Sequence, residues 1–402
     1  MRLIIALSLL LSVAFATILE NGQPRYNPYP GQARWLETGI EDADWITYAP
    51  DAEEISYKGR WDEQYISWWS APGIKFAFTG EKLALTFGEH TVNGVLVAYR
   101  VGGQDWEFAN VTANDTYQFV GPWTTGVNLT EATAQRTFEM RVQLAGVSVD
   151  ADAALYEVKP FPKMVEIIGD SLSSGDFATY EGLSSWAYLF AAGLGNVEYH
   201  LTAYPGVCLF DKNCWGNPRG LIYQWYRTSD TSPRARDIYG ENPPNWYFRG
   251  QQPADLVVIN IGTNDNNSAN NVSSTDYYND YVKLVGDIHK IWPKAQIVLM
   301  SLWGGFGPSA DTYVQGPLFV DEIRNVYRHY QRKKGNFIHY FDTTGILQHN
   351  DIAPQWHPTD VGHIKVAAHF MQWVKMTFGW EMEATGAMVH SGTLYWNDQD
   401  SY

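Results

Sequence analysis

Residues 166–175 read EIIGDSLSSG and mark the end of a short apolar run near the middle of the chain. The apolar residues VEII (165–168) stop at Gly169, Asp170 and Ser171, and small residues follow. These three residue types are turn formers, so an ordinary strand end is one interpretation. The other is a nucleophilic serine at the carboxyl edge of a parallel sheet, where open α/β sheets place their chemistry. The rest of the sequence has to decide between the two.

Apolar runs of the β type recur after this point, without polar alternation, which fits strands buried on both faces. They lie at 164–168, 197–203, 255–261, 296–301 and 337–341. Two segments between them have helical periodicity: 275–292, with Tyr278, Tyr281, Val282, Val285, Ile288 and Trp292 on one face, and 317–334, with Val320, Ile323, Val326, Tyr327 and Tyr330. Strands that alternate with such helices predict a doubly wound parallel sheet, so the fold class is α/β.

The part of the chain before this sheet has a different pattern. Residues 17–160 contain short alternating segments such as IKFAFTG (74–80), cut by Gly, Asn and Pro, which predict an antiparallel β-sandwich. The segment VKPFPK (158–163), with its two prolines, is the natural linker. We therefore expect a sandwich at 17–160, an α/β domain at 161–380 and a polar tail at 381–402.

Composition limits the function classes. The chain has 402 residues, 45% hydrophobic and 18% charged, which is typical of a globular protein with more than one domain. A net charge of −16 argues against nucleic acid or an anionic membrane as a partner. The 17 Trp and 25 Tyr exceed what a core alone explains, and such rings also suit stacking on neutral sugars.

The first 16 residues, MRLIIALSLLLSVAFA, resemble a secretory signal peptide. Arg2 is followed by an apolar stretch and by the small-x-small site Ala14-Phe15-Ala16, so we expect cleavage after Ala16 and a secreted protein. No later stretch is apolar enough to span a bilayer. Five N-x-S/T sequons agree with a secreted glycoprotein: Asn110, Asn114, Asn128, Asn266 and Asn271.

The chain has two cysteines, Cys208 and Cys214. In an oxidising compartment such a close pair is expected to form a disulfide that fixes a local loop. A catalytic thiol would need a partner motif, and none is visible.

Four motifs then follow in order: GDSL at 169–172, YPGVC at 204–208, GTND at 262–265 and WHPTDVGH at 356–363. Together they resemble the SGNH hydrolases, the GDSL-type esterase superfamily. The signature residues of that superfamily match Ser171, Gly206, Asn264 and His357. The resemblance implies an oxyanion hole formed by the backbone N–H groups of Ser171 and Gly206 and the side-chain amide of Asn264.

The chemistry requires these residue types independently of the family. A serine hydroxyl needs a base before it can attack an ester carbonyl, and a histidine can take the proton and return it to the leaving alcohol. The tetrahedral intermediate carries an oxyanion, which needs preorganised donors. Glycine at 206 allows a close approach of the backbone.

Each residue also has an ordinary interpretation. Ser171 and Asn264 could be turn residues, and His357 could simply precede a helix. The spacing of His357, Asp360 and His363 is compatible with a metal site, but we rank that well below an esterase. We expect neither a metal nor an organic cofactor.

The first domain narrows the resemblance. A sandwich with GRW at 59–61 and WWSAPGIKFAFTG at 68–80 ahead of an SGNH domain is similar to the family 2 carbohydrate esterases, which deacetylate plant cell-wall polysaccharides. The resemblance implies a jelly-roll sandwich and an O-acetyl esterase acting on xylan, glucomannan or their oligosaccharides, and we expect a monomer. The alternatives are a general short-chain esterase or lipase, and a non-catalytic carbohydrate-binding protein.

One position departs from the family pattern. SGNH hydrolases usually have an aspartate three residues before the histidine, and family 2 members often have one two residues before; here those positions are Pro354 and Gln355. We therefore predict a Ser171–His357 dyad whose imidazole is oriented by a backbone carbonyl or by Gln355. Asp351 or Asp360 are the spatial alternatives.

Substrate contacts are expected from Trp303, Trp215 and Asp170. Trp303 follows a predicted strand, and the family has a sugar-contacting tryptophan in this region. Trp356 is a further candidate, although core packing is the better interpretation for it and for Trp292.

Overall fold

The structure is a computed structural model that describes residues 19–20, 23–24, 36, 39–40, 44–102, 106–124, 142–316, 318–333, 335–352 and 356–383. The predicted signal peptide, Asn128, Pro354, Gln355 and most of the polar tail lie outside these ranges. In the described ranges, no helix combines the length and the apolar character needed to cross a membrane.

The first part of the chain is made of strands: β1 (Leu19–Glu20), β2 (Gln23–Pro24), β3 (Trp45–Tyr48), β4 (Ser56–Trp61), β5 (Ser67–Lys75), β6 (Ala77–Phe78), β7 (Leu83–Phe87), β8 (Val95–Tyr99), β9 (Glu107–Val111), β10 (Thr116–Val120), β11 (Leu144–Asp150) and β12 (Leu155–Tyr156). The second part alternates, with strands β13 (Lys163–Gly169), β14 (Val197–Ala203), β15 (Leu256–Asn260), β16 (Gln296–Met300), β17 (Phe306–Ser309), β18 (Thr312–Gln315) and β19 (Ile338–Phe341). Its helices are α1 (Ser171–Ser174), α2 (Trp186–Leu194), α3 (Leu221–Gln224), α4 (Pro233–Tyr239), α5 (Thr263–Asn266), α6 (Ser274–Ile291), α7 (Val320–Arg332) and α8 (Asp360–Phe378).

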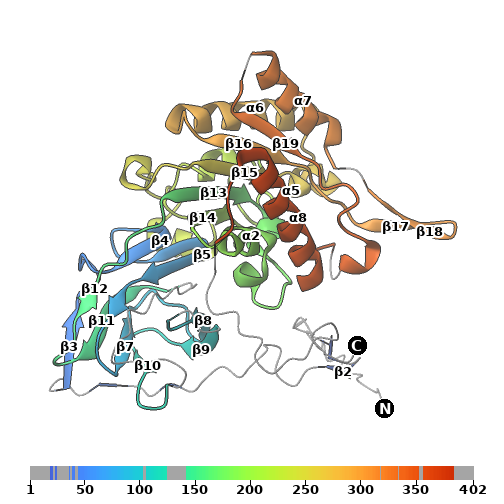
Figure 1. Cartoon of the computed structure of the whole chain (residues 1–402). Helices are drawn as coiled ribbons and strands as arrows, with labels where there is room; N and C mark the ends of the chain where they lie inside the picture. Colours follow the sequence, from blue (N-terminus) through green and yellow to red (C-terminus); the bar gives the residue numbers. More distant parts are fainter. Residues whose placement is uncertain are drawn as a thin grey trace, which may run out of the picture.

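The second part is built on a parallel sheet with helices on both faces (Figure 1), which confirms the α/β class. Strands β19, β16, β15, β13 and β14 lie side by side and parallel. Alternate residues of β13 serve different cores, because successive side chains of a strand point to opposite faces. Ile168 packs with α6 and α7, whereas Val165 and Ile167 pack with α2 and α8. All five expected strands are present.

The long helices form where periodicity predicted them, with one shift in the buried face. The fully buried residues of α6 include Tyr277 and Leu284, whereas Tyr278, on the predicted face, is only partly buried. In α7, Ile323 and Val326 are buried as expected. Tyr277 and Tyr278 are adjacent and point about 100° apart around the helix axis. The apolar pattern alone therefore does not decide which of the two enters the core.

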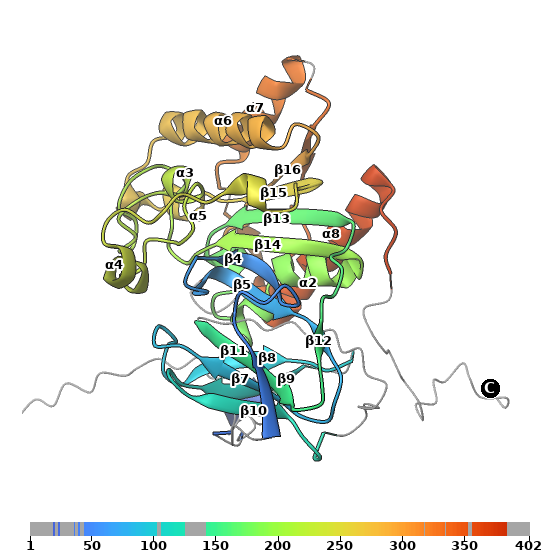
Figure 2. The same cartoon turned by 90° about the vertical axis from the view of Figure 1, so that its left-hand side faces the viewer.

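The first part is antiparallel and has its own core. Strands β10, β7, β11 and β3 form one sheet, and β8 pairs with β9. Side chains such as Phe76, Leu85 and Val147 are fully buried between these strands. Figures 1 and 2 show this region beneath the edge of the parallel sheet.

Two strands of the first part complete the sheet of the second, which the sequence did not predict. Strands β4 and β5 extend the sheet beyond β14, in the order β13-β14-β5-β4, as Figure 2 shows. Leu201 of β14 pairs antiparallel with Ser70 of β5, and Ser70 Oγ donates to the carbonyl of Ala203 at 2.9 Å. The sheet gains a cover for its exposed edge, since an uncovered edge strand has unpaired backbone groups.

Arg60, from the GRW motif, crosses from β4 into the α/β part. Its Nη1 donates to the carbonyls of Trp225 and Arg227, each at 2.6 Å, and its Nη2 lies 3.5 Å from Oε1 of Glu166. Both charged side chains are buried, at 1% and 0% exposure. Burial lowers the pKa of Arg60 to about 10, opposed by Glu166. The buried ion pair links the two parts of the chain.

We expect Arg60→Ala to lower the free energy of unfolding by about 3–5 kcal/mol, because removing one partner of a buried ion pair leaves the other uncompensated. Denaturant unfolding followed by tryptophan fluorescence measures the change. Arg324→Ala is the matched control, since Arg324 forms an exposed ion pair with Asp342 at 3.0 Å and its loss should change stability much less. Equal stability of the two variants would contradict the proposed link.

Candidate active site

The register of three parallel strands brings the sequence motifs together. Gly169, the last residue of β13, is paired with Ala203 of β14 and with Asn260 of β15. The residues that follow these three positions therefore leave the sheet at the same carboxyl edge. They are the GDSL, YPGVC and GTND motifs, so parallel pairing alone explains why segments far apart in sequence form one site.

Ser171 begins the short helix α1. Asp170 is its N-cap, and its Oδ1 accepts the N–H of Leu172 at 3.0 Å. The helix ends at Gly175, whose φ is +74°. Gly169 has to be glycine, since an added Cβ would lie 2.3 Å from Oγ of Ser173 and 2.8 Å from the carbonyl oxygen of Asn260. The serine is thus fixed on a tight strand-to-helix turn and is 6% exposed.

His357 lies beside this serine, although 185 residues separate them in the chain. Its Nε2 is 2.7 Å from Ser171 Oγ, which is hydrogen-bonding distance for a nucleophile and its base. The imidazole packs against the ring of Phe177, with 4.8 Å between centroids. The pair that the sequence predicted as a dyad is therefore in direct contact.

The loop that carries Gly206 is fixed on several sides. Gly206 has a φ of +77°, and an added Cβ would lie 3.0 Å from Trp215 Cβ and 3.1 Å from Asn217 Nδ2. Asn264 Nδ2 donates to the carbonyl of Val207 at 2.9 Å. This contact places the Asn264 amide beside Gly206, as the expected oxyanion hole requires, and one N–H of the amide remains for a ligand.

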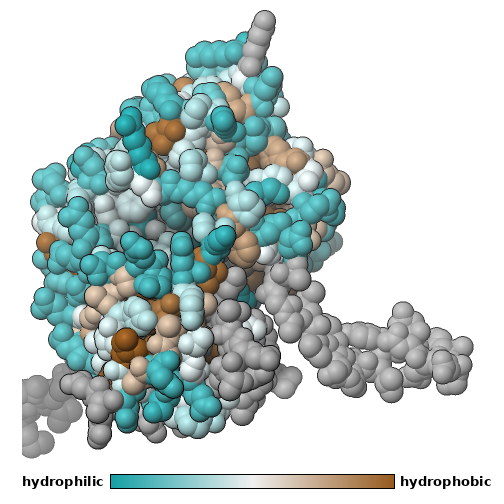
Figure 3. Space-filling model, turned by 60° about the vertical axis from the view of Figure 1, so that its left-hand side comes forward, coloured by the Kyte–Doolittle hydropathy of each residue, from teal (hydrophilic) through white to brown (hydrophobic). Residues whose placement is uncertain are grey.

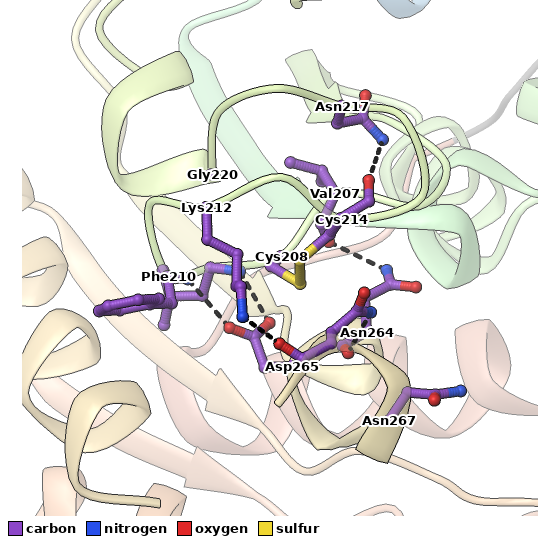
Figure 4. The surroundings of a disulfide bond; sticks show 12 residues. Val207, Cys208, Phe210, Lys212, Cys214, Asn217, Gly220, Asn264, Asp265 and Asn267 are labelled. Atoms are coloured by element: carbon purple, nitrogen blue, oxygen red, sulfur yellow. Dashed lines mark hydrogen bonds between the residues drawn. A yellow bond between two sulfur atoms is a disulfide. The ribbon is translucent and has the colours of Figure 1, made fainter. Parts of the chain in front are cut away.

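Cys208 and Cys214 form the predicted disulfide, with 2.02 Å between the sulfur atoms. Figure 4 shows that Asp265, from α5, points at the same loop. Its carboxylate accepts the N–H groups of Leu209 at 2.7 Å and Phe210 at 2.9 Å. Burial raises the pKa of Asp265 to about 6, against those two hydrogen bonds. Asp265 was not identified from the sequence, although it directly follows Asn264.

Comparison with known proteins identifies the family. Residues 167–365 match the model of the GDSL-like Lipase/Acylhydrolase family, and this range contains the serine, the glycine, the asparagine and the histidine described above. This segment of the chain belongs to the GDSL-like lipase/acylhydrolase family. The comparison with curated protein sequences gave no significant match.

Solved structures of family 2 carbohydrate esterases share the two-part fold. The enzyme from Cellvibrio japonicus has 16% identity and a TM-score of 0.64, over 84% of this chain and 98% of its own. The enzyme from Clostridium thermocellum, in complex with cellohexaose, has 19% identity and a TM-score of 0.61, over 81% and 99%. An acetyl xylan esterase from the rumen bacterium Butyrivibrio proteoclasticus has 16% identity and a TM-score of 0.61, over 84% and 99%.

The two aspartates considered as partners of His357 in this SGNH hydrolase have other partners. Asp351 accepts from Lys365 Nζ, at 2.8 Å to Oδ1 and 2.7 Å to Oδ2. Asp360 accepts the N–H of Thr179 at 2.8 Å and also the Thr179 hydroxyl. Neither residue substitutes for the family aspartate, and the prediction that a backbone carbonyl or Gln355 orients the imidazole stays a prediction.

The metal interpretation of the WHPTDVGH motif is not supported by the position of His363. This side chain is fully buried, and its Nδ1 accepts the N–H of Trp186 at 3.1 Å. Burial, with His357 nearby, lowers the pKa of His363 to about 3, so the imidazole is neutral and helps to hold α2 against α8. Asp360 binds Thr179, and within the described ranges no group of three or more His, Cys, Asp or Glu residues is placed to hold a metal ion.

Two residues expected to contact substrate are buried. Asp170 is fully buried as the cap of α1, and burial raises its pKa to about 7, against the hydrogen bond from Leu172. Trp303 is 2% exposed and packs edge-on against Trp186. A side chain enclosed in this way offers no face to a sugar, so both expectations are corrected.

Two other tryptophans are exposed at the site. Trp215 is 58% exposed and lies beside Gly206. Trp356 is 68% exposed, which corrects the expectation of core packing, whereas Trp292 is buried as expected. An added Cβ at Gly305 would lie 1.7 Å from Trp356 Cε3, so the indole ring lies against that glycine.

The first part of the chain forms one wall of a cavity that Ser174, the last residue of α1, also lines. This cavity has a volume of about 350 Å³ and is lined by Val95, Leu96 and Phe108 of β8 and β9, and by Ser174, Tyr204 and Pro205 of the α/β part. Tyr204 and Pro205 directly precede Gly206. The antiparallel region therefore contributes surface to the surroundings of the active site.

The sequons differ in exposure. Asn110, Asn114 and Asn271 are exposed, and Asn266 is half-buried in α5. Glycosylation stays a prediction.

We expect Gly206→Ala to lower kcat by about 10²-fold, because the new methyl group displaces an oxyanion-hole donor. Gly216→Ala is the matched control: Gly216 has a similar φ of +85°, but nothing lies within 4 Å of an added Cβ. Both variants should lose stability from the positive φ, with a further loss in Gly206→Ala from the contacts with Trp215 and Asn217, and only Gly206→Ala should lose activity. Steady-state kinetics on an aryl acetate and thermal unfolding distinguish the two effects, and equal kcat values would contradict the assignment.

Proposed function

We propose that this protein is a secreted carbohydrate O-acetyl esterase that removes acetyl groups from plant cell-wall polysaccharides such as xylan and glucomannan. The observation that carries the proposal is the 2.7 Å contact between Ser171 Oγ and His357 Nε2 at the edge that also holds Gly206 and Asn264. This arrangement provides a nucleophile, a base and oxyanion donors, which are the components of acyl transfer.

The reaction follows from the positions of these groups. Ser171 Oγ attacks the acetyl carbonyl carbon while His357 Nε2 takes the hydroxyl proton. The carbonyl oxygen becomes an anion and accepts hydrogen bonds from the N–H groups of Ser171 and Gly206 and from the Asn264 amide. The intermediate collapses, the sugar oxygen leaves with the proton from His357, and Ser171 is acetylated. Water, activated by His357, then releases acetate and regenerates the serine.

A sugar-bearing substrate is supported by the surroundings of the site. Trp215 and Trp356 present exposed rings on the sides of Gly206 and His357, respectively. The family 2 enzyme from Clostridium thermocellum was solved with cellohexaose, and the Butyrivibrio protein is an acetyl xylan esterase. On the coloured part of the face shown in Figure 3, hydrophobic residues lie in small groups among hydrophilic ones.

The direct test measures acetate released from acetylated glucomannan and acetylated xylan. The wild-type protein should release acetate, and Ser171→Ala and His357→Ala should both fall to the uncatalysed background. The double variant should be no slower than either single variant, because the two residues act as a unit. Absence of release by the wild type from any acetylated saccharide, with turnover of aryl or lipid esters, would favour a general esterase. Absence of turnover on all esters would favour a non-catalytic binding protein.

We expect Trp356→Ala to raise KM for acetylated oligosaccharides about tenfold and to leave KM for an aryl acetate nearly unchanged. An aromatic contact contributes about 0.5–1.5 kcal/mol, and 1.4 kcal/mol corresponds to a factor of ten. Val361→Ala is the control. Val361 is also exposed, at 55%, and lies on α8, four residues after His357. Equal losses on both substrates would exclude a sugar contact at Trp356.

A further inference from the structure

A second, larger cavity lies between the two parts of the chain, away from the catalytic serine. Its volume is about 760 Å³, within the range of small-molecule binding sites. Residues of β4 form one side, and residues of the loop 244–252 form another. Met164, Tyr199 and His200, near the amino ends of β13 and β14, also line it. Ser171 follows the carboxyl end of β13, about 20 Å further along the strand direction.

The two cavities are therefore separate sites. No residue of the dyad or of the expected oxyanion hole lines the larger cavity. A small ligand bound there does not reach Ser171, and its recognition does not depend on catalysis.

Aromatic side chains dominate the walls of this cavity. Tyr57, Trp61 and Tyr65 form a cluster on the side of β4, with ring centroids 5.0 Å and 5.5 Å apart. On the opposite loop, Trp246 and Tyr247 follow each other in sequence. Rings from two parts of the chain thus line one space. Trp61 is also part of the core of the first part, at 9% exposure, whereas Tyr247 is 69% exposed.

The loop rings are held in fixed orientations. Tyr247 is 69% exposed, yet an added Cβ at Gly250 would lie 2.7 Å from its Cδ1, so one side of the ring lies against that glycine. Trp246 Nε1 donates to Gln251 Oε1 at 2.5 Å, and the guanidinium of Arg60 lies 5.3 Å from the Trp246 ring. Side chains fixed before binding lose little entropy when a ligand arrives.

Several charged residues at this cavity have partners within the protein, and Glu63 and Glu157 add further acidic groups to the lining. Lys75 Nζ lies 2.5 Å from Glu198 Oε1, and Lys58 Nζ lies 3.8 Å from the Tyr199 ring centroid. Asp62 accepts hydrogen bonds from Trp68 Nε1 and the Tyr239 hydroxyl. Such a lining does not favour an anionic ligand. It retains hydrogen-bond donors and acceptors that a polar ligand can use.

His200 adds an uncharged polar group to the cavity wall. Its Nδ1 lies 3.6 Å from Glu166 Oε2, in the buried cluster with Arg60. Burial, together with Arg60 and Lys58, lowers the pKa of His200 to about 3, so the imidazole is neutral at physiological pH. Asn245, Gln251 and Gln252 supply amide groups around the same space.

From these contacts we propose that this cavity is a second, non-catalytic binding site for a neutral oligosaccharide or a segment of a polysaccharide. The C–H faces of sugar rings pack on aromatic rings, and sugar hydroxyls need both donors and acceptors, which the amides, carboxylates and the neutral imidazole provide. A chain held here raises the local concentration of the same polymer at Ser171. Because both parts of the protein line the site, binding also stabilises the contact between them.

The test uses the full chain with Ser171→Ala, so that no substrate is consumed, and titrates cellohexaose, mannohexaose and xylohexaose by calorimetry. Adding Tyr247→Ala should weaken binding at one site by about tenfold, and Tyr247→Phe should retain it, because the ring is kept. Tyr313→Ala is the matched control: Tyr313 is 50% exposed on the β17–β18 hairpin and does not line the cavity. The control should bind as the parent does.

A second measurement keeps the proposal separate from catalysis. In the otherwise wild-type chain, Tyr247→Ala should leave kcat/KM on an aryl acetate unchanged and reduce retention on the insoluble polysaccharide. Hexasaccharide binding that is the same in Tyr247→Ala and its parent would overturn the proposal, and so would the absence of measurable binding of all three hexasaccharides. Neither result would contradict the proposed esterase activity, because that activity is tested separately by acetate release from the wild-type protein.

Discussion

The parallel pairing of β13 with β14 and β15 is the constraint on which the site depends. Backbone hydrogen bonds fix Gly169 opposite Ala203 and Asn260, so the three following loops leave the sheet together. A slip of one residue would move every side chain of the strand to the opposite face. Such a slip would take the buried Glu166 of β13 away from Arg60 and Thr202, so these contacts help to fix the register and with it the position of Ser171.

The loops at this edge are rigid for local reasons. Asp170 caps the helix that starts with the nucleophile, and Asp265 holds the loop that carries Gly206, together with the disulfide. Both carboxyl groups are buried with raised pKa values, about 7 for Asp170 and about 6 for Asp265. Ionising them therefore costs stability, and this cost grows as the pH rises from the ordinary carboxyl pKa to these values and is present in full above them. The two carboxyl groups hold backbone N–H groups of the loops around the candidate site. Perturbed pKa values of this kind are typical of functional sites.

The antiparallel region contacts the α/β part in three ways. It extends the sheet through β4 and β5, inserts Arg60 beside Glu166, and lines a cavity at each end of β13. A region attached only through the linker at 158–163 could do none of these. The two parts are one structural unit, which gives a physical reason for the shared architecture with the family 2 carbohydrate esterases.

The sequence by itself determined the five parallel strands and the helices α6 and α7 of the α/β part, and the disulfide. It also pointed to the four residues of the expected machinery, which the fold brings to one edge. Those features depend on local patterns: apolar runs, helical periodicity, cysteine spacing and short motifs near strand ends. Only the tertiary structure decided which tryptophans are exposed, where β4 and β5 pair, and what Asp170, Asp265 and His363 bind. Such outcomes depend on contacts between residues distant in sequence: Trp303 is covered by Trp186, and Trp356 lies on Gly305, although both are tryptophans next to a candidate site. Burial is a property of the neighbours that the fold supplies, and a sequence pattern does not specify them.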